Sequence, residues 1–464
     1  MTRVVIAGGG FAGLSAALFL ARRGHVVTLI ERDGPPPAGD VEDDAERWQR
    51  PGAPQSHQSH ALLARARRVL TIEAPDVLAA LLANGVRELP VVFGAGAVAG
   101  EFALLTRRLV AEATMRRIVT NEPGVEVRSG EAVVGVQVVR SGDVPVVNGV
   151  ELLSGEVIHA DLVVDAGGRR SALPMWCSDA DLRLPTDQSQ DCGFFYLTRY
   201  YRLRHGHGMP LTVIPGATVL DYANVLALGA DNDTFSLTMT LSVDDPYRKA
   251  FRRPDRHEAL LRRVPMVAPW IEAGEPTSDI SMMARIENRR RRLVDHNGPI
   301  AAGIVAIGDA AIHTNPTLGR GISLAFAHAQ QLADMAHEAP DDPVGFVERF
   351  DAWTNDHLGV WFDAQVAADA GAIDRMQAGV DGERLPLPDA PMARFMAAAF
   401  VCGRDDELVG TAMARMVHLL ASPAEVMGDP VVTERVQRFL STNPNLERAP
   451  DVPSRAEFEV IASS

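Results

Sequence analysis

Lysine is almost absent from this chain. Lys249 is the only lysine among 464 residues, so arginine supplies nearly all of the 45 basic side chains. A guanidinium group stays protonated at physiological pH and cannot act as a neutral amine nucleophile. Schiff-base chemistry through lysine is therefore almost excluded.

Cysteine, net positive charge and long apolar runs are also scarce. The net charge of −15 disfavours nucleic acid and anionic membrane surfaces as partners. No apolar run approaches membrane-spanning length, and a short apolar strand follows Met1 so closely that no signal peptide fits. The three cysteines are too few and too scattered for a disulfide framework or a thiolate metal site: Cys177, Cys192 and Cys402. We expect a cytoplasmic protein without a membrane span.

The N-terminus has the pattern of a βαβ unit. Residues 4–7 are apolar, residues 14–23 have apolar side chains at helical spacing, and residues 26–31 are strand-like again. Glu31 ends the second strand, where a carboxylate can accept hydrogen bonds from an adenosine ribose. The turn before the helix has the spacing of the dinucleotide-binding fingerprint, with its glycines at Gly8, Gly10 and Gly13. The segment therefore predicts a dinucleotide site.

A second strand, turn and helix occur much later in the chain. Residues 304–307 are apolar and lead into Gly308-Asp309, and a long helical pattern begins at Gly321. Between them stands the turn sequence Asn315-Pro316-Thr317-Leu318-Gly319-Arg320. A carboxylate at a strand end and the free amides of a helix N-terminus are both suited to a cofactor.

Taken together, these two motifs resemble the class A flavoprotein monooxygenase superfamily, the para-hydroxybenzoate hydroxylase fold. The resemblance implies a glutathione-reductase-like Rossmann domain that binds FAD. In that family the Gly-Asp motif binds the ribityl chain, and the helix after the second turn points its N-terminus at the flavin. The residues that we expect to bind FAD are Gly8, Gly10, Phe11, Ala12, Gly13, Glu31, Arg32, Arg107, Asp165, Asp309, Pro316, Gly319, Gly321 and Ile322.

Three further segments extend the resemblance. Residues 54–63 are similar to a Pro-Gln-x-x-His-x-His-x-Leu-Leu segment of a branch that includes polyether and squalene-type epoxidases, although Gln58 stands where the pattern has histidine. Thr106-Arg107-Arg108-Leu109 resembles the segment whose arginine reaches the flavin or its diphosphate, which implies Arg107. Asp165-Ala166-Gly167 stands where the family has an Asp-Gly motif that serves FAD and the nicotinamide cofactor.

Histidines near these motifs are candidates for proton transfer, because imidazole is the side chain most easily tuned near neutral pH. A hydrogen-bonding wall beside the flavin is the simpler alternative. The candidates are His57, His60 and His313. The spacing of His, Cys and carboxylate residues indicates no metal site.

The chain as a whole predicts an α/β (α+β) protein, in which a β-sheet substrate domain is inserted into the FAD-binding domain and a helical part follows. The Gly- and Pro-rich stretch at 34–54 is typical of an exposed loop, residues 104–119 have the pattern of a helix, and residues 211–228 and 234–243 resemble strands. We expect one face of the aromatic strand at residues 194–201 to contact substrate. The candidates for the substrate pocket are Phe194, Tyr196, Tyr200 and, from the second turn, Leu318. The predicted division is 1–190 for the first part of the FAD-binding domain, 191–295 for the β-sheet substrate domain, 296–340 for the second part of the FAD-binding domain, and 341–464 for the helical C-terminal region.

The resemblance implies an FAD-dependent monooxygenase. NAD(P)H, visiting transiently, or a partner flavin reductase would reduce the flavin. O2 would then form a C4a-peroxyflavin that hydroxylates or epoxidises a bulky, largely apolar or aromatic small molecule, in keeping with secondary metabolism.

Two other functions remain open at this stage. A reductase or dehydrogenase of the geranylgeranyl-reductase type would share the fold and both glycine-rich motifs, and a silent flavin-binding protein would share the fold alone.

Flavin-dependent halogenases are also close in fold, but they use a lysine and a Trp-x-Trp-x-Ile-Pro motif. Here the motif is absent and Lys249 lies in the predicted insertion, so we expect no halogenation.

Overall fold

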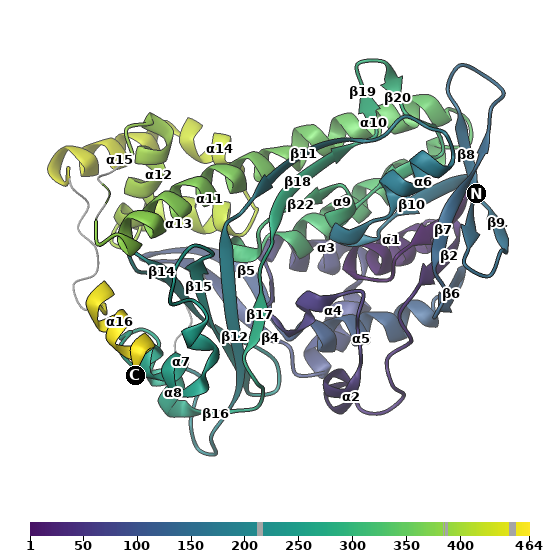
Figure 1. Cartoon of the computed structure of the whole chain (residues 1–464). Coiled ribbons are helices and arrows are strands. Elements are labelled where there is room, and N and C mark those ends of the chain that lie inside the picture. Colours follow the sequence, from purple (N-terminus) through teal and green to yellow (C-terminus); the bar gives the residue numbers. More distant parts are fainter. Residues whose placement is uncertain (211–216, 384, 386–387, 445–451) are drawn as a thin grey trace.

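A five-stranded parallel sheet forms the centre of the computed structural model, which describes residues 1–210, 217–383, 385, 388–444 and 452–464 (Figure 1). Its strands are mostly buried apolar runs, as expected where helices or further strands cover both faces. The strand order is β21 (Ile304–Ala306), β10 (Leu162–Asp165), β1 (Arg3–Ala7), β2 (Val26–Glu31) and β6 (Val125–Ser129). Because β2 and β10 flank β1 on opposite sides, a crevice is expected at the carboxyl end of β1.

Alternate side chains of β1 face two different cores. Val4 and Ile6 pack into the cluster of α1 (Phe11–Arg22), α5 (Arg108–Thr120) and α9 (Gly321–Met335). Val5 and Ala7 belong to the other cluster, which includes the antiparallel strands β7 (Val133–Val139), β8 (Val146–Leu152) and β9 (Val157–His159). The two-residue period of the strand thus separates the helical layer from the β layer.

The β-rich part forms a separate antiparallel sheet. Its order is β13 (Ala217–Val219), β14 (Ala223–Gly229), β15 (Thr234–Ser242), β12 (Phe194–Leu203) and β16 (Gly274–Pro276), and β17 (Ser281–Met283) also pairs with β12. Helices α7 (Pro254–Leu261), α8 (Ala268–Ala273) and α16 (Arg455–Ser463) cover one face with apolar side chains. Three short connecting strands tie this part to the rest: β11 (Thr186–Asp191), β18 (Glu287–Arg292) and β22 (Ile312–His313).

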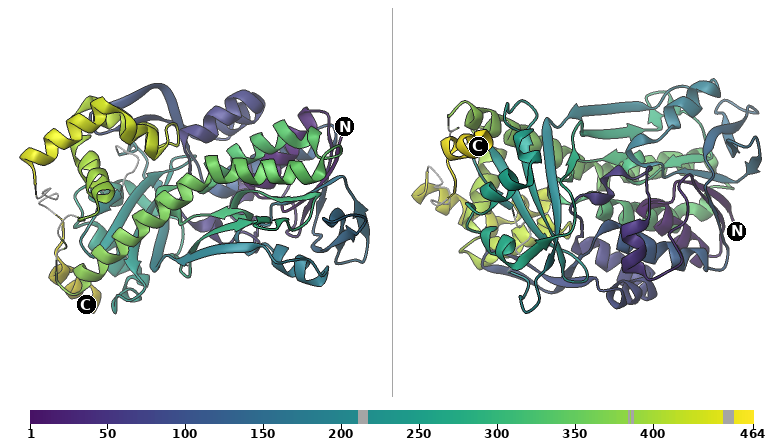
Figure 2. Two further views of the ribbon diagram at one scale, coloured as in Figure 1. Left: turned by 90° about the horizontal axis from the view of Figure 1, so that it is seen from above. Right: turned by 60° about the horizontal axis from the view of Figure 1, so that its bottom comes forward.

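The chain ends in a mainly helical region. Helix α11 (Gly359–Val380) follows α10 (Pro343–His357) and extends from β18 and β22 to β15, so that it joins the two sheet regions (Figure 2). Helix α13 (Glu407–Val417) packs against the hairpin of β4 (Arg87–Phe93) and β5 (Gly96–Leu105). The remaining helices of this region are α12 (Pro391–Cys402), α14 (Pro423–Gly428) and α15 (Pro430–Thr442).

Several local features differ from the sequence-based expectation. The Gly- and Pro-rich stretch at 34–54 contains a short helix, α2 (Val41–Arg47), because the Asp40 carboxylate accepts a hydrogen bond from the Glu42 amide and caps it. The expected helix at 104–119 begins at Arg108, since residues 104–105 pair within the sheet of β5 and β3 (Ala61–Leu62). Residues 211–216, expected in a strand, lie outside the described residues.

The last helix joins the β-rich part and not the helical region that precedes it. The Phe458 ring of α16 lies 4.5 Å from the Phe251 ring and 4.7 Å from the Tyr222 ring, between centroids. No helix within the described ranges is both long and apolar enough to cross a membrane. The mixed α/β class that the sequence predicts is confirmed.

Candidate functional site

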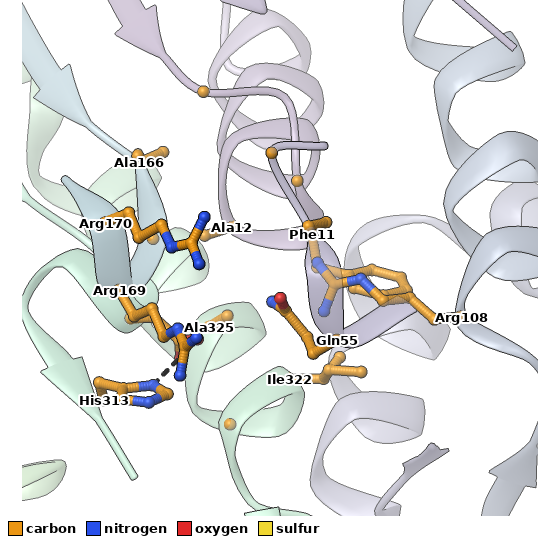
Figure 3. Close-up of a pocket in the computed structure, with 18 of the residues that line it drawn as sticks. Phe11, Ala12, Gln55, Arg108, Ala166, Arg169, Arg170, His313, Ile322 and Ala325 are labelled. Carbon is orange, nitrogen blue, oxygen red and sulfur yellow. Dashed lines mark ion pairs between the residues drawn. The ribbon is translucent and has the colours of Figure 1, made fainter. Parts of the chain in front are cut away.

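One cleft runs from the carboxyl end of β1 to the six-stranded sheet, and Figure 3 shows part of its lining. At one end it is lined by the glycine-rich turn between β1 and α1, by the ends of β2 and β10, and by Asp309, which follows β21. At the other end it is lined by side chains of β14 and β17 and by Ile286. The cleft therefore lies at the crevice that the strand order predicts.

The glycines of the first turn are required for different reasons. A Cβ on Gly8, whose φ is +117°, would lie 2.4 Å from the Ala166 carbonyl oxygen, and a Cβ on Gly13 would lie 1.8 Å from the Gly8 carbonyl oxygen. A Cβ on Gly10 would meet only the Arg108 guanidinium, at 3.6 Å. Gly8 and Gly13 are thus needed for packing, whereas Gly10 keeps the N-terminus of α1 open toward the cleft. An open helix N-terminus is suited to a diphosphate.

Five arginines line this part of the cleft and supply positive charge, the predicted Arg32 among them: Arg32, Arg50, Arg108, Arg169 and Arg170. The Arg108 guanidinium stacks 5.2 Å from the Phe11 ring centroid and donates to Glu112 Oε2 at 2.9 Å. Figure 3 shows Arg169 and Arg170 pointing into the cleft from the turn that follows β10. Guanidinium groups can form charge-assisted hydrogen bonds with the oxygens of a diphosphate.

Glu31 holds the first turn in place. It is 5% exposed, and its Oε2 accepts a hydrogen bond from the Gly9 amide at 2.8 Å. Its Oε1 accepts from the Asp33 amide at 2.9 Å, and Arg50 lies 3.2 Å away. Burial would raise the pKa of the Glu31 carboxyl, but the Arg50 charge and the two amide donors hold it below its usual range. The site therefore contains an anionic carboxylate at the end of β2.

Asp165 and Asp309 occupy different positions around the cleft. Asp165 is fully buried and accepts from the Gly167 amide at 2.9 Å and from the Ser171 hydroxyl, so it shapes the turn of Arg169 and Arg170. Burial raises its pKa. Asp309 lines the cleft, and its Oδ2 lies 3.2 Å from His313 Nδ1.

The Asp309 and His313 pair fits a ligand-facing role. Burial would raise the pKa of Asp309, but His313, with Arg108, keeps it below its usual range. The buried Nε2 atom of His313 has no hydrogen-bond partner within the described part of the chain. An unpartnered polar atom at the wall of a cleft is the arrangement expected beside a bound polar group.

The second turn continues the cleft wall. Pro316–Leu318 forms a short 3-10 helix, Gly319 has φ +66°, and α9 starts at Gly321. These residues line the cleft together with Ile322. The turn therefore presents apolar side chains and a helix N-terminus to the same space.

The far end of the cleft is largely apolar. Its residues form a chamber beneath the six-stranded sheet, to which the turn contributes Leu318. Among the described residues of this chamber no side chain carries a fixed charge, and burial lowers the pKa of His60 to about 3, so the imidazole is neutral. The chamber is lined by Gln58, Ser59, His60, Leu63, Leu226, Leu228, Met283, Ile286, Leu318 and Val417.

Several predicted site residues lie outside this cleft. Arg107 stands just before α5 and turns toward the β14–β15 connection. Its guanidinium donates to Asp231 Oδ1 from Nε at 2.9 Å and from Nη2 at 2.7 Å. The next residue, Arg108, lines the cleft instead. His57 is exposed at the surface, whereas His60 and His313 line the cleft.

The aromatic strand β12 also lies behind the cleft wall. The Tyr196 hydroxyl donates to Asn315 Oδ1 at 2.5 Å, and the Tyr200 hydroxyl donates to the Gln58 carbonyl at 2.7 Å. Phe194 is buried as well. Residues 58–60 and the second turn therefore stand between β12 and the cleft.

The sequence prediction missed other lining residues. Leu226, Leu228, Met283 and Ile286 were not singled out, although the alternation along residues 223–229 could have indicated the inward-facing leucines. Arg169 and Arg170 closely follow the Asp165-Ala166-Gly167 segment, but only their contact with the cleft distinguishes them from surface cations.

Comparisons with known proteins agree with this geometry. The family of FAD dependent oxidoreductases matches residues 3–73. Protein Rv3254 of Mycobacterium tuberculosis (strain ATCC 25618 / H37Rv) is 30% identical in an alignment of 358 positions that covers 71% of this chain and 71% of that protein.

Solved structures share the fold. PqsL, described as a probable FAD-dependent monooxygenase from Pseudomonas aeruginosa, is 20% identical with a TM-score of 0.58 and covers 82% of this chain and 99% of its own. The flavin-dependent brominase Bmp2 is 17% identical with a TM-score of 0.61, covering 94% and 99%. The 2-methyl-3-hydroxypyridine-5-carboxylic acid oxygenase is 19% identical with a TM-score of 0.56, covering 82% and 94%. The predicted fold is confirmed.

Proposed function

This chain is an FAD-dependent oxidoreductase that belongs to the family of Protein Rv3254, and we propose that it is a monooxygenase acting on a bulky, largely apolar small molecule. One observation carries the proposal: a single cleft joins a diphosphate-type glycine turn to an apolar chamber without fixed charge. Reductant, O2 and substrate can thus meet one flavin while the substrate stays out of water.

The residues of the cleft fit FAD in order along its length. The N-terminus of α1 with Arg108 would hold the diphosphate, Glu31 the adenosine ribose, and Asp309 with His313 the ribityl hydroxyls. The isoalloxazine would lie beside the turn that ends at Gly321. Bound there, FAD supplies two-electron chemistry and reactivity toward O2.

The chain's own residues provide three contributions. The free amides at the start of α9 stabilise negative charge in the space they face. Pro316 and Leu318 exclude water from the chamber. His60 is fixed by a 2.8 Å hydrogen bond from its Nδ1 to the Gln58 carbonyl, so Nδ1 donates and Nε2 is left as an acceptor. A neutral His60 supports the role of a hydrogen-bonding wall over that of a proton donor.

The reductant is part of this proposal. NAD(P)H would approach the cleft from the rim that carries Arg169 and the exposed Arg170, whose charges suit its phosphates. A partner flavin reductase could supply the same electrons. Stopped-flow mixing of the oxidised holoenzyme with NADH or NADPH tests the first route, because direct reduction bleaches the flavin absorbance.

Oxygen transfer separates a monooxygenase from a reductase of the geranylgeranyl-reductase type. The fold neighbours described as an oxygenase and as a probable monooxygenase support oxygen transfer. Turnover under ¹⁸O2 on a panel of apolar aromatic and alkene substrates should yield product that contains one ¹⁸O atom. Saturated product without ¹⁸O would establish the reductase instead.

A further inference from the structure

Asn315, which opens the second turn, has its polar groups tied to three other parts of the chain. It is fully buried. Its backbone N–H donates to Asn288 Oδ1 at 2.7 Å, its Nδ2 donates to Asp369 Oδ1 at 2.9 Å, and its Oδ1 accepts from the Tyr196 hydroxyl at 2.5 Å. The start of the turn is therefore fixed from β18, α11 and β12 at once.

Asp369 is the centre of this network. It lies on α11, is 2% exposed, and accepts from three side-chain amides. Oδ1 accepts from Asn315 Nδ2 and from Gln365 Nε2, both at 2.9 Å, and Oδ2 accepts from Asn288 Nδ2 at 2.8 Å. Both oxygens must therefore be acceptors, which only a carboxyl side chain of this length provides.

An amide at this position would be mismatched in either orientation. With its NH2 toward Asn288, it would face the NH2 of that residue; with its NH2 the other way, it would face the NH2 groups of Asn315 and Gln365. Asn288 cannot rotate to accept, because its Oδ1 already accepts the Asn315 backbone N–H. Two buried NH2 groups that face each other without an acceptor lower the stability of the folded state.

Helix α11 also holds the other end of the turn. The Arg320 guanidinium is 5% exposed and donates to the Trp361 carbonyl at 3.2 Å and to Gln365 Oε1 at 3.4 Å. Arg320 stands at the N-cap of α9. The lining residues 316–319 are thus held between two anchors, Asn315 and Arg320, that both depend on α11, and Gly321 directly follows the second anchor.

We propose that Asp369 is a positioning residue: acting through Asn315, it sets the second turn against the isoalloxazine. The inference rests on the proposed function, because it takes the flavin to lie beside this turn. The C-terminal helical region thereby becomes part of the flavin site. Tyr196 then holds the turn and does not contact the substrate. The hydrogen bond between Tyr196 and Asn315 joins the sheet over the chamber directly to the flavin-facing turn.

The test begins with Asp369→Asn in the full-length holoenzyme. We expect the FAD dissociation constant to rise about tenfold, the size of effect expected when one buried donor loses its acceptor, and the visible spectrum of the bound flavin to shift. Asp374→Asn makes the same chemical change at an exposed position of α11 and should alter neither quantity.

A paired substitution restores the pattern of donors and acceptors. In Asn288→Asp with Asp369→Asn, the new carboxylate accepts from residue 369 and from the Asn315 N–H, while the new amide oxygen accepts from Asn315 and Gln365. We expect the double variant to recover the wild-type spectrum and dissociation constant. In an Asn315→Ala background, Asp369→Asn should add almost nothing, since both act through one path.

Three results would overturn the proposal: a wild-type spectrum and dissociation constant in Asp369→Asn, failure of the double variant to recover them, or a full additional loss on top of Asn315→Ala. If Asp369→Asn does not fold, Tyr196→Phe removes one hydroxyl from Asn315, and an unchanged flavin spectrum there overturns the proposal too.

Asp309→Ala separates the role of Asp369 from the proposed function. If Asp309→Ala also leaves FAD binding unchanged, the placement of the flavin is wrong. If Asp309→Ala weakens FAD binding while Asp369→Asn does not, only the role of Asp369 is wrong.

Discussion

The Gly9 amide donates a hydrogen bond to Glu31 Oε2 across 2.8 Å, so the glycine-rich turn and the end of β2 form one unit. Glu31 also pairs with Arg50, which in turn binds Glu112 at 2.6 Å. The acidic residue that follows the fingerprint is expected to contact the adenosine ribose of a dinucleotide. Here the carboxylate supports the turn as well as lining the cleft.

Glu31→Gln should destabilise the fold and change its response to acid. The amide keeps an acceptor but leaves the buried Arg50 with one fewer anion, so we expect the free energy of unfolding to fall by about 1–3 kcal/mol at pH 7. The pKa of Glu31 is depressed in the fold, so its stabilisation is present above the unfolded value of 4.5 and is lost as the pH falls through the lower folded value. Urea unfolding between pH 3 and 7 should therefore show a flatter acid limb in the variant. Glu126→Gln, at an exposed site, is the control.

Two glycine substitutions should separate FAD binding from folding. In Gly10→Val the new side chain points toward open space, so the fold should be kept while FAD affinity falls by about 100-fold or more, because the diphosphate can no longer approach the backbone. Gly13→Val would collide with the Gly8 carbonyl and should unfold the domain. Circular dichroism and FAD titration distinguish the two outcomes, and Gly34→Val, where nothing lies near the added Cβ, is the control. Wild-type FAD affinity in Gly10→Val would contradict the assignment of the diphosphate site.

The only lysine should be dispensable. Lys249 is exposed at the start of a short 3-10 helix (Ala250–Arg252) in the β-rich part. We therefore expect no brominated or chlorinated product when reduced enzyme turns over with O2 and halide, despite the fold shared with a brominase. Lys249→Met should keep wild-type activity. Mass spectrometry of the products checks both points, and a halogenated product that disappears in the variant would contradict them.

The sequence predicted those parts of the site that depend on local backbone geometry. Gly8, Gly10 and Asp309 lie in strand-turn-helix segments whose spacing alone fixes their place, and the structure brings them to one cleft. Arg107 and Tyr196 depend instead on tertiary partners, Asp231 and Asn315, that lie far away along the chain. Motif matching cannot decide which of two adjacent arginines turns inward, because that choice depends on where Asp231 is buried.

The same contrast between local sequence pattern and tertiary packing applies to the fold. Helix α16 has an amphipathic sequence that suits either the helical region or the β-rich part, and only the aromatic contacts of Phe458 decide between them. Conversely, the parallel strands predicted from the apolar runs at 4–7, 26–31 and 304–307 match the observed bounds to within one residue. Local patterns thus specified the elements, and packing specified their partners.

Leu318 provides the last prediction, because it lies where the second turn meets the apolar chamber. A charged side chain there would draw water toward the flavin, so Leu318→Glu should convert much of the consumed reductant into hydrogen peroxide and lower the yield of oxygenated product severalfold. FAD affinity should change little, since the substitution leaves the diphosphate turn and Asp309 untouched. Leu318→Met, which keeps the apolar volume, should retain coupling. Leu184→Glu makes the same charge change at a 59% exposed leucine and should have no effect. Peroxide and product are measured together in the same reaction, and an unchanged ratio in Leu318→Glu would show that the dry chamber lies elsewhere.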